Sequence, residues 1–76
     1  MKDLVVKIVQ ALVDQPEAVS VNEIDSNQTA VLEVSVAKTD TGKVIGKHGR
    51  TAQAIRTIIG AAAGKRRKRY LFEIID

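Results

Sequence analysis

Two glycines three positions apart, Gly46 and Gly49, mark the centre of the chain. A glycine lacks Cβ, so it can adopt positive φ and lets another backbone approach closely. Lys47 and His48 lie between the two glycines, and Arg50 begins a stretch with helical periodicity. The pattern predicts a tight cationic loop before a helix N-terminus, whose free N–H groups and dipole attract phosphate. An ordinary turn between two short helices is the alternative, because short glycine motifs recur by chance.

The rest of the sequence limits the chain to one small fold. Its 76 residues leave no room for a second core, and 45% hydrophobic residues is typical of a globular chain. The lack of cysteine excludes disulfides and thiolate metal sites. The first residues do not resemble a signal peptide, and no apolar stretch approaches the ~20 residues that span a bilayer. We therefore expect one domain over residues 1–76, in the cytoplasm and without a membrane partner.

Charge is distributed unevenly along the chain, whose formal net charge is +3. Residues 3–33 hold most of the acids and a single cation, Lys7, whereas residues 38–69 are strongly basic and hold a single acid, Asp40. A basic half of this kind is typical of a surface that binds a polyanion. A solvated basic surface without a partner is the alternative.

The periodicity of apolar residues predicts an α+β fold. Apolar residues with helical spacing follow Asp3, a possible helix cap, and Pro16 ends this pattern. Apolar and polar residues alternate in residues 30–37 and 70–75, with Tyr70 and Phe72 on the core side of the second run. In chain order we expect a helix over residues 3–14, strands over 19–25 and 30–37, a short helix over 43–45, a helix over 50–63 and a strand over 70–75. This order defines a single α+β domain.

The helix predicted over residues 50–63 has more apolar surface than one small core needs. The residues expected on its core face are Ala52, Ile55, Ile59 and Ala62. A second strip of small and apolar residues, Ala54, Ile58 and Ala61, lies beside them. Either the surplus forms a self-association face that includes Ile58, Ala61 and Ala62, or the whole helix is deeply buried.

The cationic run over residues 65–69 also has two interpretations. It could contact phosphate, or it could be solvated charge before a strand. Because strand alternation sends Lys68 and Arg69 to opposite faces, the five side chains cannot act as one patch. We favour solvated charge, with one or two side chains assisting a ligand.

With this element order and a Gly46-Lys47-His48-Gly49 loop between two helices, the sequence resembles a K-homology (KH) domain. The segment over residues 44–50, V-I-G-K-H-G-R, looks like the I-G-x-x-G signature of that family. The order α-β-β-α-α-β matches its type II arrangement, a three-stranded mixed sheet with helices on one face. From residue 2 to about residue 75 the chain is similar to the small single-KH proteins of bacteria, the KhpA family.

This resemblance implies a binding site for single-stranded RNA, in which the glycine loop clamps the backbone of about four nucleotides. The residues that it assigns to RNA binding are Val44, Ile45, Gly46, Lys47, His48, Gly49, Arg50, Thr51 and Ala54. The opposite wall of the groove would come from the second strand, around residues 34–38. The family also implies pairing, either as a homodimer or with another KH-domain protein, and a role in RNA regulation.

The sequence gives little support to catalysis. Residues 42–48 look superficially like a phosphate-binding loop, but His48 stands where such a loop needs Ser or Thr to hold magnesium. His48 is the only histidine, and Asp40, the nearest acid in sequence, is separated from it by a predicted turn and short helix. We therefore expect no enzyme activity, no metal and no cofactor. A protein-interaction adaptor that uses the apolar face of helix 50–63, with nucleic-acid binding incidental, remains the alternative to an RNA-binding module.

Overall fold

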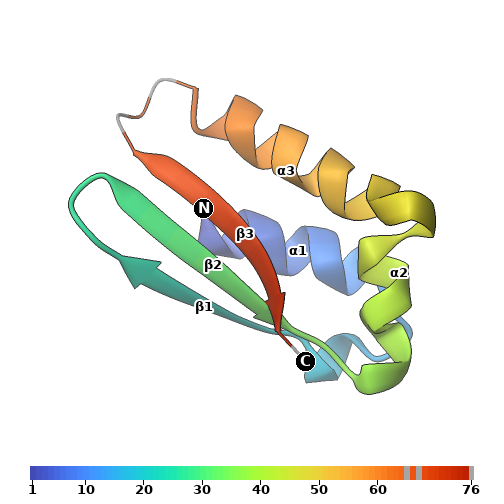
Figure 1. The fold of residues 1–76 in the computed structure, drawn as a ribbon. Helices are drawn as coiled ribbons and strands as arrows, with labels where there is room; N and C mark the ends of the chain where they lie inside the picture. The colour runs from blue at the N-terminus through green and yellow to red at the C-terminus, as the bar shows by residue number, and fades with distance from the viewer. Residues whose placement is uncertain (65, 67, 76) are drawn as a thin grey trace.

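The computed structural model describes residues 1–64, 66 and 68–75 as a three-stranded sheet backed by helices (Figure 1). The helices are α1 (Lys2–Leu12), α2 (Thr41–Ile45) and α3 (Arg50–Ala62), and the strands are β1 (Ser20–Asp25), β2 (Thr29–Ser35) and β3 (Arg69–Ile75). Three short 3₁₀ turns, η1 (Pro16–Ala18), η2 (Lys38–Asp40) and η3 (Lys47–Gly49), connect them. The predicted α+β order is confirmed.

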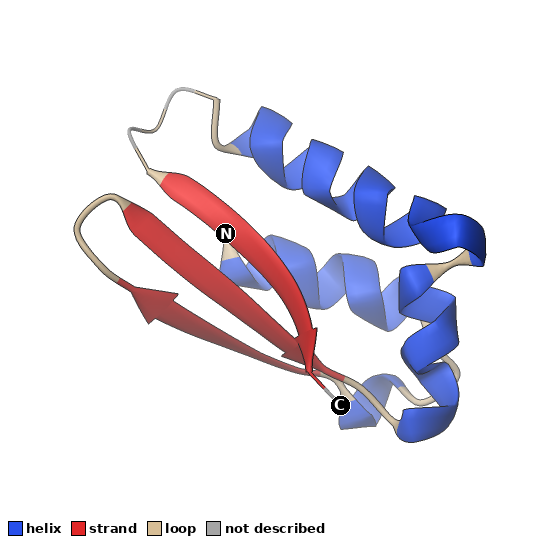
Figure 2. Cartoon of the chain, in the orientation of Figure 1, coloured by secondary structure: helices blue, strands red, loops and turns tan. Residues whose placement is uncertain are grey.

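The sheet is mixed, with the strand order β1-β2-β3. Strands β1 and β2 pair antiparallel through a tight turn, in which Ser26 N donates to Thr29 O at 2.9 Å. Strands β2 and β3 pair parallel, so the chain must cross from one end of the sheet to the other between them. Helices α2 and α3 make this crossing, and the loop between them lies at one end of the sheet (Figure 2). The type II arrangement is therefore confirmed.

The core lies between one face of the sheet and the helices. Val5 and Val9, one turn apart on α1, are fully buried in this core. Alternate residues of the strands point inward, and Phe72 on β3 is buried while Tyr70 packs at the margin, as the alternation predicted. The buried apolar residues are Val5, Val9, Val21, Ala30, Leu32, Val34, Val44, Ala52, Ile55, Ile59 and Phe72.

Several predicted boundaries are wrong. Helix α2 begins at Thr41 rather than at residue 43. Helix α1 ends at Leu12 rather than Asp14, and its N-cap is Met1, which leaves Asp3 inside the first turn. The chain becomes extended at Val13 (φ −102°, ψ 160°), because the next two N–H groups bind a carboxylate from a distant part of the sequence. Strand β2 ends at Ser35 rather than Ala37, since the chain turns into η2 shortly afterwards.

Candidate nucleic-acid interface

The backbone at Gly46 requires glycine. Helix α2 ends there, with Gly46 N donating to Gly42 O at 2.8 Å, and Gly46 adopts φ 76° and ψ 169°, a region open essentially to glycine alone. A Cβ at this position would lie 2.7 Å from Thr51 Cβ and 2.8 Å from Thr51 N. The first turn of α3 therefore presses directly against the start of the loop, and this contact fixes the angle between α2 and α3.

The second half of the loop is tightly turned but not crowded. His48 (φ 57°, ψ 25°) and Gly49 (φ 73°, ψ 13°) are both left-handed, and Gly49 N donates to Gly46 O at 3.1 Å. Histidine is among the residues that tolerate this conformation best. A Cβ on Gly49 would meet no atom within 4 Å. The two glycines thus have different roles. Gly46 allows the close packing of the loop against Thr51, and Gly49 allows the left-handed turn before α3.

Positive charge is exposed along this loop. The side chains of Lys47, His48 and Arg50 are all accessible to solvent. Within the described part of the chain, the ion pairs use other residues, Lys43 and Lys68. Gly49 caps α3 without a side-chain hydrogen bond, so the positive end of the helix dipole adds to the same field. The surface is suited to phosphate.

A buried carboxylate holds the base of α2 in place. Asp40 is fully buried, and its two oxygens accept hydrogen bonds from Asp14 N at 3.2 Å and Gln15 N at 3.0 Å. Lys43, one turn further along, lies 3.7 Å from Asp40 Oδ1 and 3.1 Å from Asp14 Oδ2. The hydrogen bond and the charge of Asp14 raise the pKa of Lys43 above its ordinary value of 10.5. Asp40 therefore ties α2, and the loop that follows, to the end of α1.

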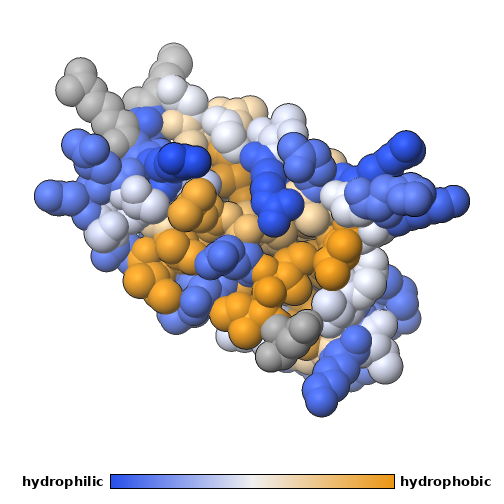
Figure 3. All heavy atoms as spheres, viewed as in Figure 1, coloured by the Kyte–Doolittle hydropathy of each residue, from blue (hydrophilic) through white to orange (hydrophobic). Residues whose placement is uncertain are grey.

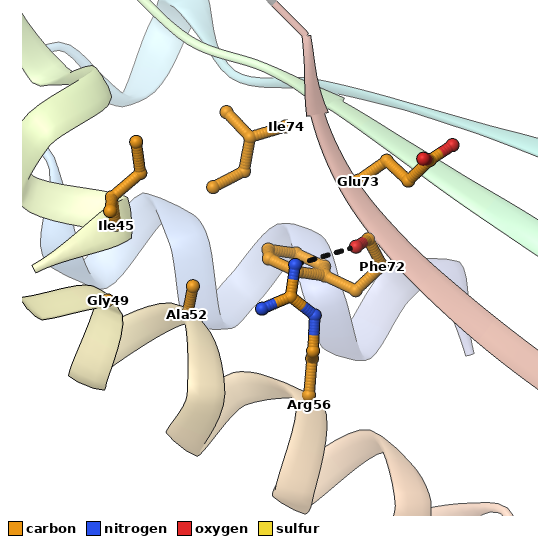
Figure 4. A pocket seen from close by; sticks show the side chains of 7 residues that line it. All are labelled: Ile45, Gly49, Ala52, Arg56, Phe72, Glu73 and Ile74. Atoms are coloured by element: carbon orange, nitrogen blue, oxygen red, sulfur yellow. Dashed lines mark hydrogen bonds between the residues drawn. The ribbon is translucent and has the colours of Figure 1, made fainter.

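A pocket of about 400 Å³ opens beside the loop, between α3 and the free edge of β3 (Figure 4). Its lining residues are Ile45, Gly49, Ala52, Arg56, Phe72, Glu73 and Ile74. The side chain of Glu73 points away from the pocket, so its backbone forms this part of the wall. Residues 34–38, which we expected to form the opposite wall, do not line this pocket, because β2 is the central strand and β3 lies between it and α3.

Arg56 is the polar side chain of the pocket that the sequence did not single out. Its Nη2 donates to Phe72 O at 3.3 Å, and its guanidinium carbon lies 5.7 Å from the centre of the Phe72 ring (Figure 4). These contacts hold the planar guanidinium of Arg56 at the pocket, where its other N–H groups can donate hydrogen bonds to a ligand. Helical spacing could have found it, because Gly49, Ala52 and Arg56 at i, i+3 and i+7 share one face of α3.

The structure brings only part of the predicted site to this surface. Ile45 and Gly49 line the pocket, whereas Val44 is fully buried in the core and Thr51 packs beneath Gly46. Ala54 is exposed on α3, away from the pocket. Val44 is thus a structural residue, because it faces the sheet from the short helix that Asp40 anchors.

The surplus apolar strip on α3 is exposed. Ile58 is 45% exposed, and Ala54, Ala61 and Ala62 are also accessible. The core face consists of Ala52, Ile55 and Ile59, so the prediction that Ala62 faces the core is wrong. The alternative of a helix buried on every side is wrong for the same reason.

Two described side chains of the basic run before β3 contact other residues of the chain. Lys68 forms an ion pair with Asp25, which raises the pKa of Lys68 through a hydrogen bond, and Arg66 Nη1 donates to Tyr70 Oη at 3.3 Å. Arg69 is exposed at the start of β3. The interpretation as solvated charge is therefore wrong for Lys68. Lys65 and Arg67 lie outside the described residues.

A glycine loop between two helices, a mixed sheet with parallel β2 and β3 and a pocket at the edge of β3 together define a type II KH domain. The KhpA/KhpB KH-domain family matches residues 2–74, and the chain belongs to this family. It is 57% identical, over 99% of its length and the whole of the relative, to the RNA-binding protein KhpA of Caldanaerobacter subterraneus. It is 50% identical over its whole length to 94% of the protein of the same name from Bacillus subtilis, and 43% identical to 97% of that from Chlamydia pneumoniae. No solved structure matches the chain.

These relatives are named as RNA-binding proteins rather than enzymes, in agreement with the expectation of a non-catalytic chain. Among the residues that the structure describes, no group of histidine and acidic side chains could hold a metal ion. In that same part of the chain, every helix is too short or too polar to span a bilayer.

Proposed function

We propose that residues 1–76 act as one KH domain that binds single-stranded RNA, with the backbone on the Gly46–Gly49 loop and bases in the neighbouring pocket. The observation that carries the proposal is the position of an exposed cationic loop directly beside a pocket of about 400 Å³. A relative that is 57% identical bears the name RNA-binding protein, which supports the same ligand. We place the protein in the cytoplasm, where bacterial RNA is found.

The loop supplies the contacts to phosphate. Lys47 and Arg50 carry fixed positive charge, and His48 adds a ring N–H donor on the same turn. The N-terminal N–H groups of α3 point toward the same place, where they stabilise an anion. These contacts do not depend on the base, so they set affinity and register along the strand.

The pocket supplies the contacts to bases. Ile45 and Ile74 offer aliphatic surface, and Arg56 offers donors to acceptor atoms on a base edge. The Phe72 ring is only 4% exposed and lies beneath Arg56, so it is not a stacking platform of the kind that other RNA-binding folds use. Bases packed on aliphatic side chains imply modest affinity for one domain.

Pairing would raise that affinity through avidity. The exposed strip of Ile58, Ala61 and Ala62 on α3 is the surface that we assign to a second copy or to another KH-domain protein. Small side chains there let two helices approach closely. The strip lies on α3 beyond the pocket, so a pair could bind RNA through both loops.

The test is the affinity for a short randomised single-stranded RNA, measured across salt concentrations. Lys47→Asp combined with His48→Asp should weaken binding by at least ~100-fold, or about 2.7 kcal/mol, and make the salt dependence shallower. Lys7→Asp combined with Gln10→Asp makes the same charge change on the exposed side of α1 and should leave most of the affinity. Equal binding by both double variants would show that RNA is held only by nonspecific charge, and it would overturn the assignment of the loop as the RNA-binding site.

The exposed α3 strip favours one other function, that of an adaptor whose main partner is a protein. Ile58→Lys should break self-association, seen by sedimentation, while each monomer keeps weak RNA binding. If Ile58→Lys alone removed RNA binding and the loop variant did not, the adaptor function would replace direct recognition by the loop.

A further inference from the structure

The face of the sheet opposite the helices is open. Helix α1 packs behind the strands and α3 runs beside β3, and the viewer of Figure 1 looks onto the other face. Side chains alternate along each strand, so half of the residues of β1, β2 and β3 point away from the helices. No described helix covers them.

The strand register places an apolar row across this face. Ile24, Val31 and Leu71 are direct neighbours on the three strands, and Ile24 is 49% and Leu71 37% exposed. Ile75, 42% exposed, lies four residues beyond Leu71 on β3. Figure 3 shows apolar atoms gathered in separate groups over this side of the molecule, with hydrophilic atoms between them. Exposed apolar surface of this kind marks interaction sites.

Two glutamates occupy the space between the apolar groups. Glu33 on β2 and Glu73 on β3 are direct partners in the parallel pairing of these strands. Along β3, Glu73 lies two positions from both Leu71 and Ile75. Like charges at directly opposite positions oppose strand pairing. Among the described residues, the ion pairs use Asp14, Asp25 and Asp40 rather than these two glutamates. Glu73 is exposed and Glu33 is half-buried on this face.

We propose that this open face, formed by Ile24, Val31, Glu33, Leu71, Glu73 and Ile75, docks an amphipathic helix of a partner protein that carries Lys or Arg between apolar side chains. The charge of the face selects this occupant. A helix is the element that covers an open sheet face, and a cation at its centre would relieve the repulsion between Glu33 and Glu73.

The same charge argues against the other occupants. In a two-fold pair of this chain, the two copies would place four carboxylates against one another. Phosphates of RNA or of an anionic membrane would be repelled in the same way. The basic loop lies at the end of the sheet, on α2 and α3, so the partner and RNA could bind together. This inference does not depend on the proposed RNA site.

The apolar groups set the spacing of the partner. Leu71 and Ile75 are four strand residues apart, ~13 Å, which is the length of about eight to nine helical residues. The matching helix carries apolar residues at i and i+8 and a cation midway between them, at i+4. Three synthetic helical peptides that differ only at i+4, as Lys, Gln or Glu, are therefore the probes, and fluorescence anisotropy measures their binding.

The Lys peptide should bind the full chain most tightly and the Glu peptide at least ~10-fold more weakly. Glu33→Gln with Glu73→Gln should remove this preference for Lys, and the exposed change Leu71→Ser should weaken all three peptides. A matched control, Asp3→Asn with Glu17→Gln, removes the same charge elsewhere on the surface and should change nothing. Circular dichroism checks that each variant is folded.

Three results would overturn the proposal. The first is no binding, or the same affinity for all three peptides. The second is self-association of the wild-type chain that Leu71→Ser abolishes and Ile58→Lys does not, which would assign the face to a second copy. The third is binding to vesicles of phosphatidylcholine and phosphatidylglycerol that Leu71→Ser abolishes, which would assign it to a membrane.

Discussion

The two halves of the segment from Lys38 to Arg50 use charge in opposite ways. In the first half, Asp40 is fully buried and Lys43 is paired with two carboxylates. In the second half, Lys47, His48 and Arg50 are exposed. A buried carboxylate is tolerated only with hydrogen-bond partners, so the charge of the first half serves the fold. The exposed charge of the second half contributes little to stability and stays available to a ligand.

Gly46 stands at the junction of these halves and Gly49 lies within the second, so one substitution at each separates their roles. Gly46→Ala should destabilise the protein by about 3 kcal/mol or more, because the backbone region is closed to alanine and the methyl group overlaps Thr51. Gly49→Ala should cost only about 1–2 kcal/mol, the ordinary penalty of the left-handed region. Urea unfolding of the two variants gives the comparison, and equal losses would contradict it.

Asp40→Ala tests the folding half alone. The change leaves the N–H groups of Asp14 and Gln15 without their carboxylate, at about 1–3 kcal/mol each when buried. We expect a loss of about 3 kcal/mol in the free energy of unfolding. Asp3→Ala, an exposed acid on α1, is the control and should stay within ~0.5 kcal/mol of the wild type. Faster hydrogen exchange at residues 41–46 in Asp40→Ala would show that α2 has lost its anchor, and unchanged exchange there would contradict that role.

Gly49→Asn tests whether the second half of the segment lies against the RNA. Asparagine adopts the left-handed conformation more readily than other side chains, and the space around Gly49 is open. The variant should therefore lose less than about 1 kcal/mol of stability. The substitution adds a polar side chain at a residue that lines the pocket, so RNA affinity should fall further than stability does. Unchanged affinity would place the RNA backbone away from Gly49.

The smallest expected effect is the pH dependence of the Lys43 pair. The pKa of Lys43 is raised in the folded protein by Asp14, so its stabilising effect is complete below its ordinary pKa of 10.5. It is lost as the pH rises through the higher, folded pKa. Thermal unfolding between pH 9 and pH 12 should show this loss in the wild type and a smaller one in Asp14→Asn. Identical pH profiles for the wild type and Asp14→Asn would show that the pair of Lys43 with Asp14 does not contribute to stability.

Much of the fold could be predicted from local patterns. The spacing of Val5 and Val9, the alternation of Leu32 and Val34 and the position of Phe72 report directly which side of each element is buried. The helix boundaries were less accurate, because α1 stops where the Asp40 carboxylate, 25 residues away, binds Gln15 N. A contact between distant residues leaves no periodic signal in the sequence.

The binding surface was predicted in part for the same reason. The loop from Gly46 to Gly49 consists of adjacent residues, so its glycines and charged side chains can be identified from the sequence. The opposite wall depends on which strand lies next to α3, and only the parallel pairing of β2 with β3 decides that. Arg56 belongs to the pocket because Phe72 O lies within its reach across the groove.

The order of the elements, the inward faces of the strands and the cationic glycine loop follow from the sequence alone, since each depends on residues close together in the chain. Tertiary packing places β3 rather than β2 at the wall of the pocket, buries Asp40 within the fold and brings Glu33 and Glu73 together on the open face. These depend on how distant segments pair, because burial and neighbouring charge exist only once the strands and helices have packed together.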